Sequence, residues 1–305
     1  MSINLDSKIP IVIKKDKFIN YVNFNATEKA YLINVAIVNM KIPEKFISDN
    51  INPNRNTNIS FERQADLYDL LNSAIKKPKS DIVVFPELSI PTIWLPFMVN
   101  FSRKHQISLI FGLEHWIIKK NAHNFVVTLV PFKINKFYKA CFLSIRLKNY
   151  YAPKEIKELR KNNLQVFTNP KLYHEIFNWR GNRFSVFNCF ELTNIGHRSE
   201  LVGKADYIAA IAWNKDINYF SNILESMTRD LHCYIIHSNT SQYGDSMIIA
   251  PKKREMMNFV RVKGGINPVL MKARLDINKL RLFHENENND INDEFKPLPA
   301  GFKRK

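Results

Sequence analysis

The stretch FSVFNCFELTNIGHRSEL, residues 184–201, decides how the rest of the chain is interpreted. Its first four residues are aromatic or β-branched and turn-forming residues bound them, which predicts a short buried strand. Cys189 lies where that strand stops and polar residues begin. A strand holds the backbone of such a residue rigidly while the side chain projects beyond the sheet edge, which is the usual place of a nucleophile.

A thiol at that position needs a base to take its proton and a positive donor to stabilise the oxyanion that forms. The sequence offers candidates for both at the ends of two other apolar runs. Glu87 ends the run 82–86, and Lys148 ends the run 142–147. Three predicted strands, each with one catalytic-type residue at its C-terminal end, form a much stronger signal than any one of these residues.

Composition indicates a globular protein outside the membrane. The chain has 305 residues, of which 45% are hydrophobic, and this supplies ample material for a core. No apolar run reaches the roughly 18 residues that span a bilayer, and the N-terminus lacks the pattern of a secretory signal. The three cysteines fit neither a disulfide framework nor a zinc site, and the eight histidines show no metal-ligand spacing. We therefore expect a reducing cytoplasm, no metal and no cofactor.

The charge is unusual, since 45 Lys and Arg against 28 Asp and Glu give a net charge of +17. Such an excess suits a polyanionic partner: nucleic acid, an acidic protein or a phosphorylated substrate. A solvated surface rich in Lys and Asn, without any polyanionic partner, would give the same net charge. Only residues 252–254 and 303–305 form compact basic runs, and we see no aromatic–basic interleaving of the kind that RNA readers use. Both interpretations stay open.

Strands alternate with helices in both halves of the chain, and antiparallel pairs are inserted between them. Ser60 is a plausible N-cap of a helix that leads to the strand before Glu87. A further edge hairpin is expected over 171–179. The pattern alone predicts an α/β fold with mixed sheets.

We expect residues 1–31 to form an N-terminal arm or an extra edge strand, residues 32–284 the main domain, and residues 285–305 a flexible or docking tail.

Three segments, VVFPELSIP, LKNYYAPKE and FNCFEL, resemble in order and spacing the three motifs of the nitrilase (carbon–nitrogen hydrolase) superfamily, over roughly residues 33–282. The resemblance implies a four-layer α-β-β-α sandwich of nitrilase type with mixed sheets, a homo-oligomer and a Glu–Lys–Cys triad. In that triad Glu87 is the general base towards Cys189 and then towards water. Lys148 stabilises the oxyanion, together with the backbone N–H of Phe190.

The resemblance also implies the residues around the substrate. Glu155 would be the second glutamate of the family, which positions the substrate or the lysine. The chain departs from the family pattern after Cys189, because the segment 192–200 is longer than the corresponding segment of typical members and contains no proline. Residues 239–246 resemble the loop that closes the site. The predicted substrate-binding residues are Glu155, Phe190, Glu191, Trp213, Asn214 and Asn239.

The function implied is a cysteine-dependent hydrolase that cleaves a non-peptide amide-type carbon–nitrogen bond of a small molecule through a thioester. Two alternatives stay open. An amine could resolve the thioester in place of water, which would be acyl transfer. The chain could also be a partner-binding module, because AIAWNKDINYFSNILESMTRDLHCY and NTSQYGDS are similar to the nitrilase-type domains that accompany bacterial defence reverse transcriptases. That resemblance implies an antiviral context with a nucleic-acid or reverse-transcriptase partner.

Overall fold

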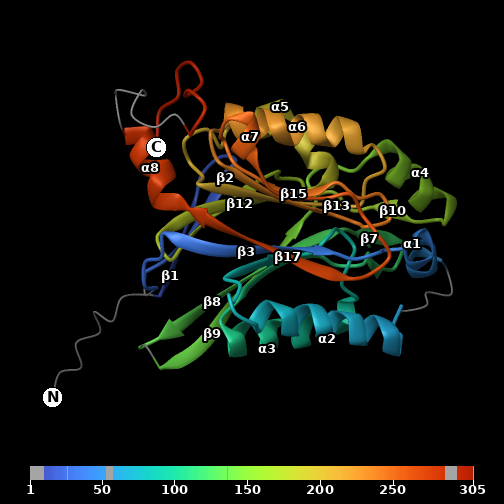
Figure 1. Ribbon diagram of the computed structural model, residues 1–305. Coiled ribbons are helices and arrows are strands. Elements are labelled where there is room, and N and C mark those ends of the chain that lie inside the picture. Colours follow the sequence, from blue (N-terminus) through green and yellow to red (C-terminus); the bar gives the residue numbers. More distant parts are fainter. Residues whose placement is uncertain (1–9, 26, 53–57, 136, 286–293, 305) are drawn as a thin grey trace.

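The computed structural model describes residues 10–25, 27–52, 58–135, 137–285 and 294–304. Two β-sheets pack face to face, and helices cover the outer face of each (Figure 1). The predicted four-layer α-β-β-α sandwich with mixed sheets is confirmed. None of the helices in these ranges is long and apolar enough to cross a membrane.

The first sheet has the strand order β1-β2-β11-β12-β13-β14-β15-β16. Its central strands β12, β13 and β14 run parallel, and β15 and β16 complete it in antiparallel fashion. The strands are β1 (Ile11–Lys15), β2 (Ile19–Phe24), β11 (His174–Trp179), β12 (Asn182–Asn188), β13 (Tyr207–Ala212), β14 (Tyr234–Asn239), β15 (Ser246–Ile249) and β16 (Asn258–Val262).

The second sheet has the order β17-β3-β4-β5-β8-β9, and a small third sheet has the order β10-β7-β6. The strands of the second sheet are β17 (Val269–Asp276), β3 (Leu32–Asn39), β4 (Ile82–Val84), β5 (Ser108–Gly112), β8 (Phe125–Ile134) and β9 (Tyr138–Leu147). Those of the third are β10 (Gln165–Val166), β7 (Asn121–His123) and β6 (Trp116–Ile118).

Helices α2 (Phe61–Ile75) and α3 (Leu95–His105) cover the second sheet, and α5 (Ile195–Ser199) and α6 (Ile217–Asp230) cover the first (Figure 1). Ser60 caps α2 as predicted, since its side chain accepts a hydrogen bond from the Arg63 N–H. The other helices are α1 (Glu44–Ile51), α4 (Pro153–Lys161), α7 (Arg254–Met257) and α8 (Ile277–Glu285), with 3-10 turns η1 (Thr92–Trp94) and η2 (Cys189–Thr193).

The inner strands are buried on both faces, and successive side chains along each strand pack into different hydrophobic cores. Val35 and Ile37 belong to the core between the two sheets, while Ala36 and Val38 belong to the core beneath α2 and α3. A third core lies beneath α6. Each sheet is therefore fixed from both sides, which holds the residues at its strand ends in place.

The expectation of an edge hairpin over 171–179 is wrong. The strand β11 lies inside the first sheet, paired parallel to β2 and antiparallel to β12. The edge is formed instead by β1 and β2, from the segment expected as an arm or an extra edge strand. At the other end of the chain, Phe295 is only 4% exposed and Arg304 donates a hydrogen bond to Asp206, so the described part of the tail packs on the sandwich.

Candidate active site

Three strand ends, two from one sheet and one from the other, meet at one edge of the sandwich. Glu87 lies three residues past the end of β4, Lys148 directly follows β9, and Cys189 directly follows β12. Because each strand is pinned within its sheet, the three side chains are presented from a rigid frame. The structure thus brings together the three residues predicted as catalytic.

The ammonium group of Lys148 lies between two carboxylates. Its Nζ donates to Oε1 of Glu87 at 2.6 Å and to Oε2 of Glu155 at 2.8 Å. Lys148 is 1% exposed, and this burial by itself lowers its pKa. The charges of Glu155 and Glu87 outweigh burial and raise the pKa of Lys148 well above its usual value. The lysine is therefore a fixed positive charge.

Glu155 is held in its charged form by the same contact. Burial raises the pKa of Glu155, but Lys148 and His115 outweigh that effect and hold it well below the usual range. His115 Nε2 lies 3.4 Å from Oε1 of Glu155. Glu155 also lines the cavity described below, so it can act on the lysine and face a substrate, as predicted.

Asn124, which sequence reasoning missed, connects the two carboxylates. Its Nδ2 donates to Glu87 at 3.0 Å and to Glu155 at 2.8 Å, and its Oδ1 accepts from Asn188 at 3.1 Å. The N–H of Trp213 donates to the second oxygen of Glu87 at 3.1 Å. Glu87 is therefore oriented through both oxygens. In an Asn-rich chain, nothing in the sequence singles out Asn124.

Cys189 occupies a strained backbone position at the end of β12. Its φ is 49°, in the left-handed region that residues with a Cβ rarely adopt. Cys189 as a whole is 7% exposed. Burial raises the pKa of the Cys189 thiol well above its usual value, Glu87 raises it further, and Lys148 opposes them. The resting group is therefore a thiol, and it needs a base to become a nucleophile.

Glu191 does not contact the cavity, which corrects its predicted role in substrate binding. It is fully buried and accepts hydrogen bonds from Arg146 at 2.7 and 2.9 Å. It also accepts from the backbone N–H groups of Asn149 at 2.6 Å and Asn188 at 2.8 Å. Burial raises the pKa of Glu191, but Arg146 overcomes this and lowers it to about 2. Glu191 thus ties the residues next to Lys148 and Cys189 together.

Asn239 is likewise a positioning residue, not the substrate contact that was predicted. It is 2% exposed, and its Oδ1 accepts from the N–H of Asn214 at 2.9 Å. Its Nδ2 donates to the carbonyl groups of Asn214 and Gly244, both at 2.9 Å. The loop 239–246 therefore holds Asn214 at the site through Asn239.

A cavity of about 570 Å³ opens beside these groups. Four of the predicted substrate-binding residues line it: Glu155, Phe190, Trp213 and Asn214. Residues of helices α1 and α4 also line it. The apolar part of the wall is formed by Ile47, Ile51, Leu88, Ala152, Leu159, Phe190, Trp213 and Phe220. Glu87 and Cys189 also line the cavity, so the reactive groups face an apolar space of ligand size.

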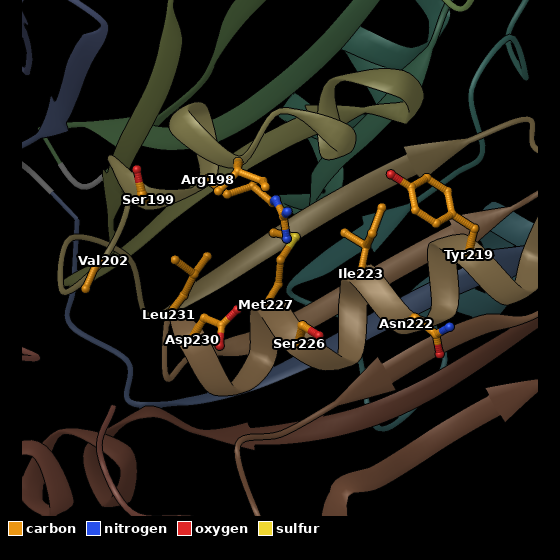
Figure 2. A pocket seen from close by; sticks show the side chains of 11 residues that line it. Arg198, Ser199, Val202, Tyr219, Asn222, Ile223, Ser226, Met227, Asp230 and Leu231 are labelled. Carbon is orange, nitrogen blue, oxygen red and sulfur yellow. The ribbon is translucent and has the colours of Figure 1, made fainter. Parts of the chain in front are cut away.

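A second hollow, of about 400 Å³, lies between α5 and α6 on the outside of the first sheet (Figure 2). Figure 2 shows Arg198 from the α5 side approaching Ile223 and Met227 of α6. Neither a predicted site residue nor a cysteine lines it. Within the described ranges, no group of three or more His, Cys, Asp or Glu side chains is arranged to hold a metal ion.

Sequence comparison finds no relative: no protein-family model and no curated protein matches the chain. Solved structures do match. An amidase from Nesterenkonia sp. superposes with a TM-score of 0.57 at 12% identity, over 84% of this chain and 95% of the amidase. A carbon–nitrogen hydrolase superfamily protein from Xanthomonas campestris, with an arsenic adduct in its active site, gives 0.58 at 10% identity, over 84% and 95%.

A variant of the Nesterenkonia amidase gives a TM-score of 0.56 at 12% identity, over 86% of this chain and 98% of that chain. In that structure the acetamide moiety of fluoroacetamide is covalently added to the active-site cysteine. At such low identities the likeness concerns the fold. The chain has the α-β-β-α sandwich fold of the nitrilase, or carbon–nitrogen hydrolase, superfamily.

Proposed function

We propose that this protein is a cysteine-dependent hydrolase of a non-peptide, amide-type carbon–nitrogen bond, acting through a thioester on Cys189. One observation carries the proposal: a buried ammonium, Lys148, is clamped between Glu87 and Glu155 at the end of the cavity where Cys189 emerges. The amidases that share the fold support it, since one of them carries an adduct on its active-site cysteine.

The first half-reaction forms the thioester. Glu87 accepts the thiol proton as Sγ of Cys189 attacks the carbonyl carbon of the amide. The proton then passes from Glu87 to the leaving nitrogen, the carbon–nitrogen bond breaks, and ammonia or an amine departs. The raised pKa of the thiol makes this transfer to Glu87 necessary, because little thiolate exists beforehand.

The tetrahedral oxyanion needs a fixed positive partner. Lys148 supplies one, because its charge is secured by two carboxylates and its surroundings are shielded from water. The backbone N–H of Phe190, the first amide after Cys189 in η2, is the second donor that we assign. A preoriented donor of this kind contributes roughly a 100- to 1,000-fold rate enhancement.

The second half-reaction restores the thiol. Water attacks the thioester carbon while Glu87 again accepts a proton, which it returns to the departing sulfur of Cys189. The products are a carboxylic acid and free enzyme. If an amine took the place of water, the same site would perform acyl transfer. The partner-binding alternative needs none of these groups, so their assembly around one cavity favours the enzyme.

The substrate that we propose is a small molecule with an amide-type group and an apolar body, since most of the cavity wall is apolar. The homo-oligomer, the cytoplasmic location, the antiviral context and the nucleic-acid or reverse-transcriptase partner stay predictions. The proposed thioester pathway does not depend on any of these predictions.

The test compares wild type with Cys189→Ala, and Cys141→Ala is the matched control because Cys141 lies within β9, away from the cavity lining. Each protein is incubated with a metabolite extract and with a panel of aliphatic and aromatic amides. Untargeted mass spectrometry and ammonia release are the readouts. We expect conversion of an amide to its acid by wild type and Cys141→Ala only. Equal conversion by Cys189→Ala, or none by a folded wild type, would refute the proposal.

A further inference from the structure

The β8–β9 hairpin extends well beyond the sheet to which it belongs. These strands pair along their full lengths, from Phe125↔Leu147 to Ile134↔Tyr138. The neighbouring strand β5 pairs with β8 only as far as Leu129. Residues 130–134 and their partners 138–142 therefore form an arm of about 15 Å, at roughly 3.3 Å per residue. Figure 1 shows this arm projecting from the body of the molecule.

The base of the arm is firmly held. The indole N–H of Trp179 donates to the carbonyl of Pro131 at 2.7 Å. The ring of Phe24 packs against Phe132 and Phe142, with centroids 5.9 and 5.7 Å apart. Two strands from the other sheet thus support the arm, so its tip is presented on a rigid base.

The tip exposes large apolar and aromatic side chains. Phe137 is 85% exposed, Tyr138 is 70% exposed and Ile134 is 40% exposed. Single exposed apolar residues are ordinary, but three at one projecting turn form a contact surface. None of these side chains belongs to a hydrophobic core.

Positive charge gathers around the same tip. Lys133 and Lys139 are directly opposite each other in the ladder, an arrangement that destabilises a β-pair. Lys139 Nζ donates to the carbonyl of Lys104 at 2.9 Å, and Lys79 Nζ to that of His105 at 2.5 Å, at the end of α3. Cations from three parts of the chain therefore converge here. A polyanion would relieve their mutual repulsion.

The electrostatics of Lys79 agree with this geometry. Burial lowers the pKa of Lys79, and Lys139 and Lys133 lower it further. Asp81, the acid that opposes them, is already paired with Arg180.

The sequence carries the same signal, which was overlooked. Residues 132–139 read FKINKFYK, so lysines and aromatic residues alternate closely. The chain therefore does contain a stretch of aromatic–basic interleaving, contrary to the expectation from the sequence. The hairpin makes the pattern meaningful, because it places residues 133 and 139 side by side below the aromatic turn.

We propose that the tip of the β8–β9 hairpin binds single-stranded nucleic acid. Phe137 and Tyr138 stack on unpaired bases, while Lys133 and Lys139 neutralise phosphates. Duplex binds more weakly, because its bases are already stacked on each other. Because an anionic membrane also offers negative charge and apolar surface to such a tip, binding to vesicles is an outcome of the test.

The proposed binding surface is independent of the cavity. Strand β9 runs from Tyr138 at the tip to Leu147, which precedes Lys148. Its ten residues span about 30 Å, so a change at the tip leaves the catalytic groups untouched. Failure of this proposal and failure of the proposed hydrolase can therefore be told apart.

The experiment measures fluorescence anisotropy of labelled 20-nucleotide dT and U oligomers, of a matched duplex, and of anionic phosphatidylserine vesicles. Three full-length variants are compared with wild type: Phe137→Ala/Tyr138→Ala, Lys133→Glu/Lys139→Glu, and the control Lys157→Glu/Arg160→Glu. The control makes the same change in net charge on the exposed face of α4. Phe137→Ala alone and a thermal melt of each protein guard against misfolding.

We expect wild type to bind single strands more tightly than duplex. The aromatic variant should bind at least about 30-fold more weakly, because it removes both rings on which bases stack. The Lys133→Glu/Lys139→Glu variant should bind more weakly still and depend less on salt, while the control stays within about twofold of wild type. Equal loss in the control, no binding by wild type, or tip-dependent binding of vesicles without binding of oligomers would overturn the proposal.

Discussion

Cys189 adopts a backbone conformation that most residues with a side chain avoid, with φ of 49° directly after a buried strand. Such strain persists only where the surrounding structure imposes it, and it is concentrated at functional sites. Here η2 and the buried Glu191 impose it, since Glu191 accepts the N–H of Asn188, the residue before Cys189. In this position Cys189 borders the core beneath α6 and, like Glu87, lines the cavity.

The first prediction concerns the thiol. Burial and Glu87 raise the pKa of Cys189 above its usual value, so its thiolate fraction should grow as the pH rises through and beyond that value. In Glu87→Gln one of these causes is removed while Lys148 stays, and the pKa should fall. We expect the pH profile of Cys189 alkylation by iodoacetamide to move to lower pH in Glu87→Gln, measured by peptide mass spectrometry.

Glu158→Gln provides the control, because Glu158 lines the cavity and its carboxylate is paired with the surface lysine Lys161. An alkylation profile that stayed at the wild-type pH in Glu87→Gln, or shifted equally in Glu158→Gln, would contradict the assigned electrostatics.

At this scale the sequence predicts that Glu87, Lys148 and Cys189 lie together, but it does not predict the residues that support them. Glu87, Lys148 and Cys189 each follow a recognisable apolar run, so their meeting could be expected. Arg146 lies within such a run and pairs with Glu191 across the two sheets, which no local pattern reveals. The same reason explains why Glu191 was assigned to the substrate: its partner is 45 residues away in sequence.

At the scale of elements, β5 fixes the turn that carries Glu87. A Cβ placed on Gly112 would lie 2.4 Å from the N of Leu88 and 2.7 Å from the Cα of Glu87. Only glycine permits this close approach. The turn continues through Leu88, whose φ is 57°. The end of β5 thus determines how far Glu87, the proposed general base, reaches into the cavity.

Gly112→Ala should therefore displace Glu87 and reduce kcat/KM for the amide substrate by roughly 100-fold, the cost of a misplacement of about 1 Å. Gly196→Ala is the control, because the nearest contact of its added Cβ would be 3.3 Å from Asn194 Oδ1. Steady-state kinetics, together with a thermal melt, give the comparison. Wild-type kinetics in a folded Gly112→Ala would show that the turn does not set the position of Glu87.

The Arg146–Glu191 pair joins the strand before Lys148 to the turn after Cys189. The pKa of Glu191 falls from 4.5 to about 2 on folding. The contribution of the ionised Glu191 carboxylate to the free energy of unfolding is thus fully present above pH 4.5 and is lost as the pH falls through 2. By linkage this contribution to the free energy of unfolding is about 3 kcal/mol at neutral pH.

Glu191→Gln should lower the free energy of unfolding at pH 7 by about 3 kcal/mol, because it leaves Arg146 buried without its counterion. It should also flatten the loss of stability between pH 4.5 and 2. Urea denaturation across this pH range measures both effects. The double variant Arg146→Met/Glu191→Leu should be less destabilised than Glu191→Gln. If its loss of stability equalled the sum of the losses in Arg146→Met and Glu191→Leu, the two residues would not be a coupled pair.

At the scale of the whole molecule, the sequence predicts the layers but not how the ends of the chain complete them. The alternation of strands and helices predicts an α/β fold with mixed sheets, and the resemblance to the nitrilase superfamily supplies the four-layer sandwich. Strand order depends on long-range pairing, so β1 and β2 joining β11 at the sheet edge could not be derived. The composition of residues 285–305 likewise conceals the burial of Phe295.

Phe295 lies against Phe283 and His232, with ring centroids 5.1 and 6.3 Å apart. Phe295→Ala should lower the free energy of unfolding by about 3 kcal/mol, as expected for truncation of a buried aromatic residue. Phe137→Ala, the same substitution at an exposed site, should change it by less than about 0.5 kcal/mol. Chemical denaturation of both variants decides the matter: equal stabilities would mean that the C-terminal segment does not belong to the core.

The most direct test of the central claim is to search for the acyl group on Cys189 during turnover. Wild-type protein is mixed with its amide substrate, quenched in acid within milliseconds to seconds, digested and analysed by mass spectrometry. We predict a substrate-derived acyl group on the peptide that contains Cys189, removable by hydroxylamine, and none on the peptides of Cys141 and Cys233. Conversion of the amide with Cys189 unmodified throughout, or undiminished in Cys189→Ala, would contradict the account.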